Sequence, residues 1–217
     1  MNPWTYFRDH QSDVLHWLWT TVWIAGAPLL VGLVIAFPIG YLASRYKWAY
    51  PPVVTLAGLL YTIPSLALFI VLPGILGTKI LDAINVAVAL TAYTVALLVR
   101  VVADALNAVP PDTKAAATAM GFTRQQRLIG VELPLAVPVV AAGLRVAAVS
   151  NVSLVSVASV IGVPQLGSLF TEGFQSSTYD PIVLGLILIV ALALIFDGVI
   201  LFGARLLTPW QRAVRAR

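Results

Sequence analysis

The chain has 217 residues, of which 60% are hydrophobic and only 10% are charged, and its formal net charge is +4. Soluble domains contain roughly 45–50% apolar and about 25% charged residues, so this chain would aggregate as a soluble protein. Cysteine is absent, which excludes a disulfide framework, a thiol nucleophile and a cysteine metal site. The composition therefore predicts a membrane protein.

Five apolar segments are long enough to cross a bilayer as helices, for which about 20 mostly apolar residues are needed. Charged residues or Pro and Gly flank each of them, and we expect spans at 18–43, 53–76, 83–105, 135–161 and 182–206. The first segment is too long for the hydrophobic part of a signal peptide. The predicted fold class is an all-α membrane protein with five transmembrane helices in a single domain, residues 1–217.

The loops between the spans differ strongly in positive charge. An odd number of spans puts the termini on opposite sides, and the side rich in Lys and Arg is normally cytoplasmic. The bases on the outer side are Arg8 and Lys79. Those on the other side are Arg45, Lys47, Lys114, Arg124, Arg127, Arg205, Arg212, Arg215 and Arg217. We therefore expect the N-terminus outside and the C-terminus in the cytoplasm.

The second span contains Pro64, which removes one backbone hydrogen bond and clashes with the carbonyl of Leu60. Thr62 and Ser65 carry hydroxyls that can bond the freed group. A polar, kinked patch at this depth suits a solute path, and a tolerated kink at a helix contact is the alternative.

Residues 107–134 form a polar, cytoplasmic loop between the third and fourth spans. Asp112 or Thr113 can cap a first helix, which the alanines that follow favour. Gly121 suits the left-handed position that ends such a helix, and a second short helix is expected to end at Pro134. A compact protrusion of this kind indicates a docking site, whereas an ordinary amphipathic surface loop is the alternative.

The fourth span carries a winding polar stripe, made of Ser150, Asn151, Ser153 and Ser156. The stripe suits a translocation path, and close helix packing explains it equally well.

Charges within a membrane are costly and usually paired. Arg145 and Asp197 lie at matching depths in the fourth and fifth spans, so we expect an ion pair that is structural, with a gate latch or a proton relay as the functional alternatives. Arg100 and Asp104 are four residues apart and can share a helical face.

Signs of an enzyme are absent from the sequence. No phosphate loop is present, since "GILGTK" at 74–79 has the wrong spacing. No catalytic triad, carboxylate pair or metal cluster is recognisable, so we expect neither a catalytic residue nor a metal or cofactor in this chain. "QLGSLFTEGF" at 165–174 is predicted to form a short helix in the outer loop.

The pattern Ala116-Ala117, Gly121 and Leu133-Pro134 resembles the "EAA" loop of binding-protein-dependent ABC importer permeases. Ala115 stands where that family has Glu, and Val131 where it has Ile. The resemblance implies a coupling helix that docks on an ATPase subunit, and the implied docking residues are Lys114, Ala115, Ala116, Ala117, Met120, Gly121, Phe122, Arg124, Leu133 and Pro134.

Three further segments are similar to osmoprotectant-type permeases: "YTIPSLALFIVLPGILG" at 61–77, "VELPLAVPVVAAGLRVA" at 131–147 and "ASVIGVPQLGSLFTEGF" at 158–174. The resemblance implies the type I ABC importer fold and inward movement of a quaternary amine such as glycine betaine, choline or carnitine by alternating access. A methionine or amino-acid permease of the same fold is the alternative, followed by a standalone secondary transporter or channel.

The same resemblance implies a bacterial cytoplasmic (inner) membrane location and a set of partners. These are a second permease copy or paralogue, two ATPase subunits that bind ATP and Mg, an extracytoplasmic solute-binding protein and membrane lipid. No nucleic-acid partner is expected.

Overall fold

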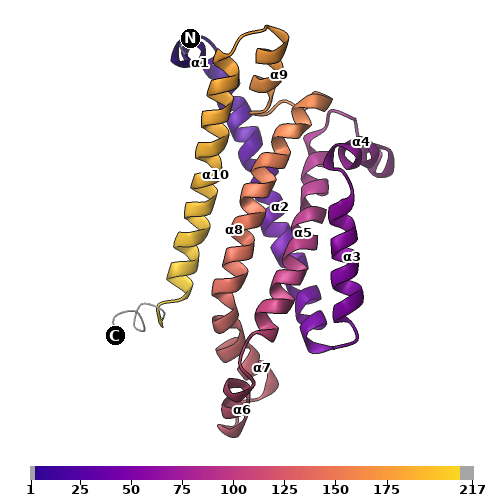
Figure 1. Ribbon diagram of the computed structural model, residues 1–217, viewed down its shortest axis with the longest axis vertical. Helices are drawn as coiled ribbons and strands as arrows, with labels where there is room; N and C mark the ends of the chain where they lie inside the picture. The colour runs from indigo at the N-terminus through magenta and orange to yellow at the C-terminus, as the bar shows by residue number, and fades with distance from the viewer. Residues whose placement is uncertain (1–2, 211–217) are drawn as a thin grey trace.

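The computed structural model describes residues 3–210, which form helices joined by short connections and no strands. Figure 1 shows an elongated bundle with α1 and α9 at one end and α6 and α7 at the other. The elements are α1 (Pro3–Asp9), α2 (Gln11–Arg45), α3 (Tyr50–Thr62), α4 (Ser65–Leu76), α5 (Ala83–Asn107), α6 (Pro111–Ala119), α7 (Arg124–Arg127), the π-helix η1 (Leu128–Glu132), α8 (Leu133–Val157), the 3₁₀-helix η2 (Ala158–Ile161), α9 (Ser168–Gln175) and α10 (Asp180–Leu207).

Four of the five predicted spans are long continuous helices. Among the described residues, Gln11–Arg45, Ala83–Asn107, Arg124–Ile161 and Asp180–Leu207 are each long and apolar enough to cross a membrane. α1 and the last turn of α10 lie at opposite ends of the bundle (Figure 1), as an odd number of passes requires. The basic tail residues Arg212, Arg215 and Arg217 lie outside the described residues.

The segment predicted as a continuous span at 53–76 is instead two helices, α3 and α4, bent by 99° at the break between them. Pro64 disfavours helical geometry at the residue before it, and Ile63 is accordingly extended, with φ −69° and ψ 126°. α4 therefore turns across the bundle at the level where α3 ends (Figure 1).

Hydroxyl groups from α5 and from α3 itself donate hydrogen bonds to carbonyl groups near the break. Tyr93 of α5 donates its hydroxyl to the carbonyl of Ile63, at 2.6 Å. Thr62 donates to the carbonyl of Leu59, at 2.7 Å, and the Leu60 carbonyl, where Thr62 was predicted to help, accepts from the Ile63 N–H at 3.3 Å. The structure shows no such bond for Ser65. The break is therefore a fixed feature that α5 holds in place.

α5 is the central helix, and it packs against α2, α3, α4 and α8. Its closest approach to α2 occurs at two glycines. A Cβ added at Gly40 would lie 2.8 Å from the Val99 carbonyl oxygen and 2.8 Å from the Cβ of Val102, and one at Gly32 would lie 2.5 Å from a Thr94 methyl group. Small residues allow this close backbone contact, which holds helices together in lipid.

One polar network crosses the centre of the bundle. Asn151 of α8 is buried and donates to the Thr94 hydroxyl at 3.0 Å and to the Ala25 carbonyl at 3.3 Å. These bonds join α8, α5 and α2. They satisfy an amide that would otherwise be left without partners in an apolar interior.

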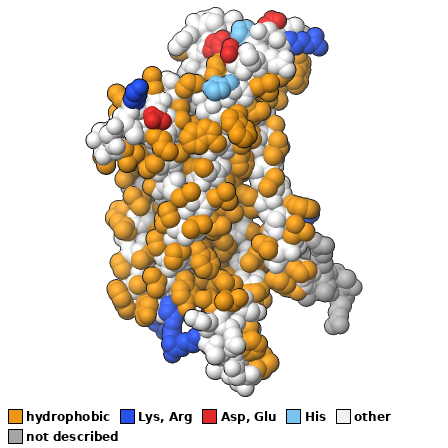
Figure 2. Space-filling view, turned by 180° about the vertical axis from the view of Figure 1, so that it is seen from behind, with side chains coloured by type: hydrophobic (Ala, Val, Ile, Leu, Met, Phe, Trp, Pro, Cys, Tyr) orange, Lys and Arg blue, Asp and Glu red, His pale blue; other side chains and the backbone are white. Residues whose placement is uncertain are grey.

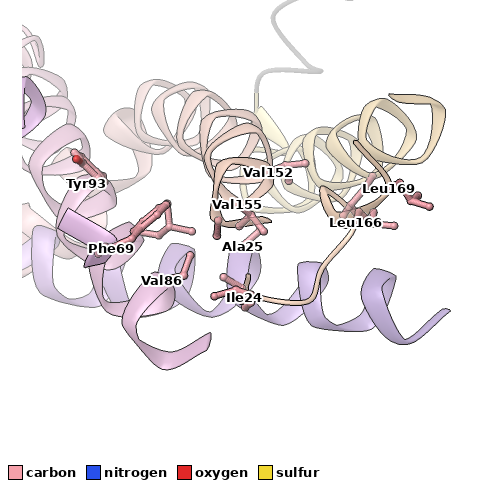
Figure 3. Close-up of a cluster of buried hydrophobic side chains, with 14 of the residues drawn as sticks. Ile24, Ala25, Phe69, Val86, Tyr93, Val152, Val155, Leu166 and Leu169 are labelled. Atoms are coloured by element: carbon pink, nitrogen blue, oxygen red, sulfur yellow. The ribbon is translucent and has the colours of Figure 1, made fainter. Parts of the chain in front are cut away.

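An apolar cluster fills the bundle toward the end that carries α9. Figure 3 shows Ile24 and Ala25 of α2, Val152 and Val155 of α8, Leu166 from the connection to α9 and Leu169 of α9, which belong to one buried cluster. The backbone of Leu166 also donates to the Thr21 hydroxyl, at 3.0 Å. The outer connection is therefore anchored in the core.

We predict that Gly40→Ala destabilises the protein by about 1–3 kcal/mol, the usual cost of inserting a methyl group into a packed contact. Gly58→Ala is the matched control, because a Cβ at Gly58 meets nothing within 4 Å and alanine favours the helix by about 1 kcal/mol. Thermal unfolding of the purified protein in detergent measures both. Equal stability of the two variants would contradict the close contact of α2 with α5.

Candidate functional site

The 107–134 loop is ordered and projects beyond the bundle (Figure 1). Its first helix, α6, is capped by Pro110 and begins at Pro111, so neither Asp112 nor Thr113 is the cap that the sequence suggested. Proline suits the first helical position, which Pro111 occupies, because its ring fixes φ and its missing N–H needs no partner in the first turn. The helix therefore starts two or three residues earlier than predicted.

Gly121 ends α6 in the predicted left-handed conformation, with φ +86°. Its N–H donates to the Thr118 carbonyl at 3.0 Å, and the N–H of Phe122 donates to the Ala117 carbonyl at 3.2 Å. Left-handed backbone is costly for residues that carry a Cβ. The reversal between α6 and α7 therefore depends on this glycine.

The second helix of the loop does not end at Pro134, contrary to the prediction. A capping box formed by Thr123 and Gln126 starts α7, and the helix continues through η1 into α8, as one stretch from Arg124 to Ile161. In a regular helix the Pro134 ring would clash with the carbonyl four residues earlier. The wider turn of the π-helix precedes Pro134 and relieves this clash.

Glu132 holds the two halves of the loop together. Its carboxylate lies 2.8 Å from the Nε of Arg127, five residues earlier, a spacing that a π-helix brings to one face. Lys114 of α6 lies 3.9 Å from the same carboxylate and donates to the Leu106 carbonyl at 3.0 Å. Arg127 also donates to the Thr118 hydroxyl at 3.0 Å. The loop is therefore cross-linked to the end of α5.

Glu132 is a residue that the sequence interpretation missed. Its signal was one of only two acids in a basic loop, placed after Lys114, Arg124 and Arg127, which need a counter-charge.

Nine of the ten predicted docking residues fall into two groups, and the tenth, Pro134, is half-buried in the first turn of α8. Ala117 is buried, Lys114 points into the loop, and Leu133 packs on a buried cluster with Val102 and Leu106. The outward-facing group is Ala115, Ala116, Met120, Gly121, Phe122 and Arg124, which are exposed. Met120 is 70% exposed, and Ile129, which was not predicted, is 67% exposed. We call Met120, Phe122 and Ile129 the apolar tip, because they are the large apolar side chains that the loop exposes between α6 and α8.

The predicted path residues lie in different surroundings. Thr62 and Pro64 are exposed at the α3–α4 break, with Ser65 half-buried beside them. The ring of Tyr61 meets that of Tyr93 edge-on, with centroids 5.5 Å apart. These residues form an aromatic and polar patch around the break.

The residues of the polar stripe of α8 differ in how deeply they are buried. Asn151 is buried in the three-helix network, and the Ser156 hydroxyl bonds the Val152 carbonyl at 3.3 Å. Ser150 is half-buried and Ser153 is exposed. The geometry of Asn151 matches the packing alternative, and the role of the three serines in a path stays a prediction.

The predicted pair between Arg145 and Asp197 is present and is bidentate. The Nε of Arg145 lies 2.6 Å from one carboxylate oxygen, and its second nitrogen lies 2.8 Å from the other. This fork geometry is the strongest form of the Arg–carboxylate contact. It joins α8 to α10. The Arg100–Asp104 pair is looser, at 3.6 Å, and exposed.

The opposite end of the molecule carries the predicted short helix, observed as α9 (Ser168–Gln175). Buried Gln165 anchors its start by donating to the Ser156 carbonyl, at 3.3 Å. Burial raises the pKa of the Tyr6 hydroxyl above its usual value, and the neighbouring Glu172 carboxylate raises it further. α1, α9 and the start of α10 therefore form a small cap at this end.

Comparison with known proteins identifies relatives over almost the whole chain. The family model "Binding-protein-dependent transport system inner membrane component" matches residues 29–208. The osmoprotectant import permease protein OsmW of Salmonella typhimurium is 34% identical, over 94% of this chain and 96% of that protein. The carnitine transport permease protein OpuCB of Listeria monocytogenes is 28% identical, over 89% of this chain and 87% of that one.

Solved structures with the same fold are also found. A permease chain from inward-facing MetNI, a methionine ABC transporter, matches with a TM-score of 0.79 at 21% identity, over 92% of this chain and 98% of that chain. A chain of an amino acid ABC transporter with histidines matches with a TM-score of 0.65 at 18% identity, over 93% of this chain and 95% of that chain. At these identities the likeness shows the fold alone.

We predict that Asp197→Ala and Arg145→Ala each lower the thermal midpoint of the purified protein more than the double variant does. A single change leaves an unpaired charge between α8 and α10, whereas the double change removes both charges. The exchange Arg145→Asp with Asp197→Arg should restore part of the loss. Additive single effects in this double-mutant cycle would contradict the pair.

Proposed function

Since the chain belongs to the family of binding-protein-dependent transport system inner membrane components, we propose that it is the permease subunit of an ATP-driven ABC importer for quaternary-amine compatible solutes. The observation that carries the proposal is the likeness to osmoprotectant, carnitine and choline permeases along nearly the full chain. The structure adds a rigid loop with an apolar tip, which is suited to docking.

We propose that the loop end faces the cytoplasm of a bacterial cell and that the helices cross the cytoplasmic membrane. Arg45, Lys47, Lys114, Arg124 and Arg127 all lie toward this end, as the distribution of positive charge across bacterial membranes requires. Figure 2 shows an apolar middle section, with charged side chains gathered mainly at the two ends of the visible face. The N-terminal end is then outside.

The chain then works with several partners. An ATPase subunit docks on the apolar tip and binds ATP and Mg, so that ATP hydrolysis takes place outside this chain. Five spans do not enclose a path, and a second permease copy or paralogue, with its own ATPase subunit, completes it. The α1–α9 end receives the solute-binding protein.

Movement of the ATPase reaches the translocation path through one continuous helical stretch, Arg124–Ile161. Glu132 fixes α6 and α7 to each other, and η1 joins α7 to α8 without a break. Closure of the ATPase pair moves the loop, and α8 moves with it, together with α10 through the Arg145–Asp197 pair. The two permeases thereby alternate between outward and inward openings, driven by the different affinities of the two states for ATP and solute.

The patch at the α3–α4 break fits a quaternary amine. A quaternary ammonium group has no N–H to donate, and it is recognised by aromatic faces. Tyr61 is exposed beside the break and rests on Tyr93. A methionine or amino-acid solute is less favoured, because the relatives in that class are similar at the level of the fold, with 21% identity or less in the two chains compared above.

One prediction of the proposed function concerns the uptake of solutes. Cells that lack other carriers should lose ATP-dependent uptake of labelled glycine betaine, choline or carnitine when this chain is deleted, and should regain it on re-expression. Labelled methionine and histidine are the controls. Loss of amino-acid uptake with quaternary-amine uptake unchanged would overturn the proposed substrate class.

The second prediction concerns docking. Gly121→Ala forces a Cβ into left-handed backbone, at a cost of about 1–2 kcal/mol, so the native turn should be populated roughly tenfold less. We expect weaker co-purification of the ATPase subunit and slower uptake, with unchanged thermal stability of the spans. Gly130→Ala is the matched control, because Gly130 lies in the same loop without a left-handed φ, and its Cβ would meet only the edge of Phe122 at 4.0 Å. Identical behaviour of the two variants would count against docking through this turn.

A further inference from the structure

A wide apolar groove opens between α2, α5, α8 and α10 in the half of the bundle next to the loop. Its volume is about 610 Å³, and its walls include Phe37 of α2, Val140 of α8 and Leu207 of α10. Every residue that lines it is apolar or glycine. Such a surface does not suit a path for a polar solute, but it suits a hydrocarbon chain.

A smaller polar pocket of about 180 Å³ adjoins the groove at the loop end. Leu106 lines both cavities, so they are neighbours at the loop end of α5. The pocket lies between the end of α2 and the loop, and its charged lining residues are Arg45, Lys114, Arg124, Arg127 and Glu132. The apolar groove and the charged pocket are therefore close enough for one lipid molecule to reach both.

The pocket has an excess of positive charge. Four basic side chains and one acid line it, which leaves three positive charges uncompensated. The Glu132 carboxylate forms ion pairs with Arg127 and Lys114. Within residues 3–210, Arg45 and Arg124 have no ion pair or side-chain hydrogen bond. Both side chains are exposed, and guanidinium groups without a counter-charge favour a phosphate oxygen.

We propose that the groove and the pocket together bind one anionic phospholipid, with its phosphate among Arg45, Arg124 and Arg127 and an acyl chain along the groove. Charge complementarity selects an anionic headgroup, and the adjoining apolar groove selects a lipid over a free phosphate. Trp48 and Tyr46, at the same end of α2, are residues typical of the headgroup level. Basic pockets between helices on the cytoplasmic side are known to suit such headgroups.

The position of the pocket gives the lipid a role. Its walls come from α2 on one side and from the loop on the other, so a bound headgroup connects the two. The stability of the loop against the bundle then depends on the anionic lipid content of the inner leaflet. This inference concerns the loop and the lipid, and it does not depend on which solute is transported.

Native mass spectrometry of the purified full-length chain, with the subunits that co-purify, tests the headgroup site. The probes are phosphatidylglycerol and phosphatidylcholine with identical acyl chains. Each basic side chain near an anionic headgroup contributes roughly fivefold in affinity, so the double variant Arg45→Gln/Arg124→Gln should bind phosphatidylglycerol about 25-fold more weakly. Its binding of phosphatidylcholine should be unchanged. Lys47→Gln is the matched control, because Lys47 is exposed at the same end but does not line the pocket.

A second pair of variants tests the groove. Gly203 lines the groove, and a Cβ there meets nothing within 4 Å, so Gly203→Leu places a large apolar side chain in the groove. Gly198→Leu on the same helix is the control, because Gly198 is equally open but lies outside the groove. We expect the Gly203 variant to lose phosphatidylglycerol binding and the Gly198 variant to keep it.

Three results would overturn the proposal. Equal stabilisation of the protein against heat by glycerol phosphate and by a short-chain phosphatidylglycerol would show that the pocket is an ion site only. Unchanged phosphatidylglycerol affinity in the double variant would show that the pocket holds no headgroup. Loss of a co-purifying subunit with lipid affinity unchanged would identify the pocket as a protein contact. In each case, the uptake of quaternary amines still tests the proposed function separately.

Discussion

Lipid tails are as apolar as leucine, so apolar contact alone does not draw the helices of this bundle together. Close backbone packing and satisfied polar groups must hold them, and both depend on α5. α5 meets α2 across Gly32 and Gly40, shares the Thr94–Asn151 bond with α8, and bonds the broken end of α3 through Tyr93. α5 therefore fixes the position of the α3–α4 break, and its last turn also holds the 107–134 loop through the bond from Lys114 to the Leu106 carbonyl.

The long apolar runs allowed the fold class and most of the spans to be predicted, because hydropathy responds directly to the thickness of a bilayer. The α3–α4 break was predicted only as a kink. Pro64 indicates where the helix is disturbed, but the size of the bend depends on a partner for the Ile63 carbonyl, and Tyr93 supplies it from 30 residues away along the chain. A contact between distant segments leaves no periodic trace in the sequence.

The loop shows the same division between local and distant causes. The left-handed Gly121 was predictable, since the backbone preference of glycine is a local property. The inward direction of Lys114 was not, because it is set by Glu132 on the other side of the turn. Asn151 was read as a path residue with packing as the alternative, and the bonds that bury it come from two other helices. Arg145 and Asp197 could be paired from the sequence because two charges at equal depth in lipid have few other partners.

The π-helix between α7 and α8 also fixes an angle. One extra residue in a turn shifts everything beyond it by about 100° around the helix axis. A helical wheel drawn through Arg124–Val157 with a constant period would therefore assign the faces of α7 wrongly relative to those of α8. Deleting one residue between Leu128 and Glu132 would keep Arg127 beside Glu132, now at the spacing of an ordinary helix turn. It would nevertheless rotate the apolar tip by more than a quarter of a circle around the axis of α8. The one extra residue of the π-helix therefore sets the direction in which the apolar tip points.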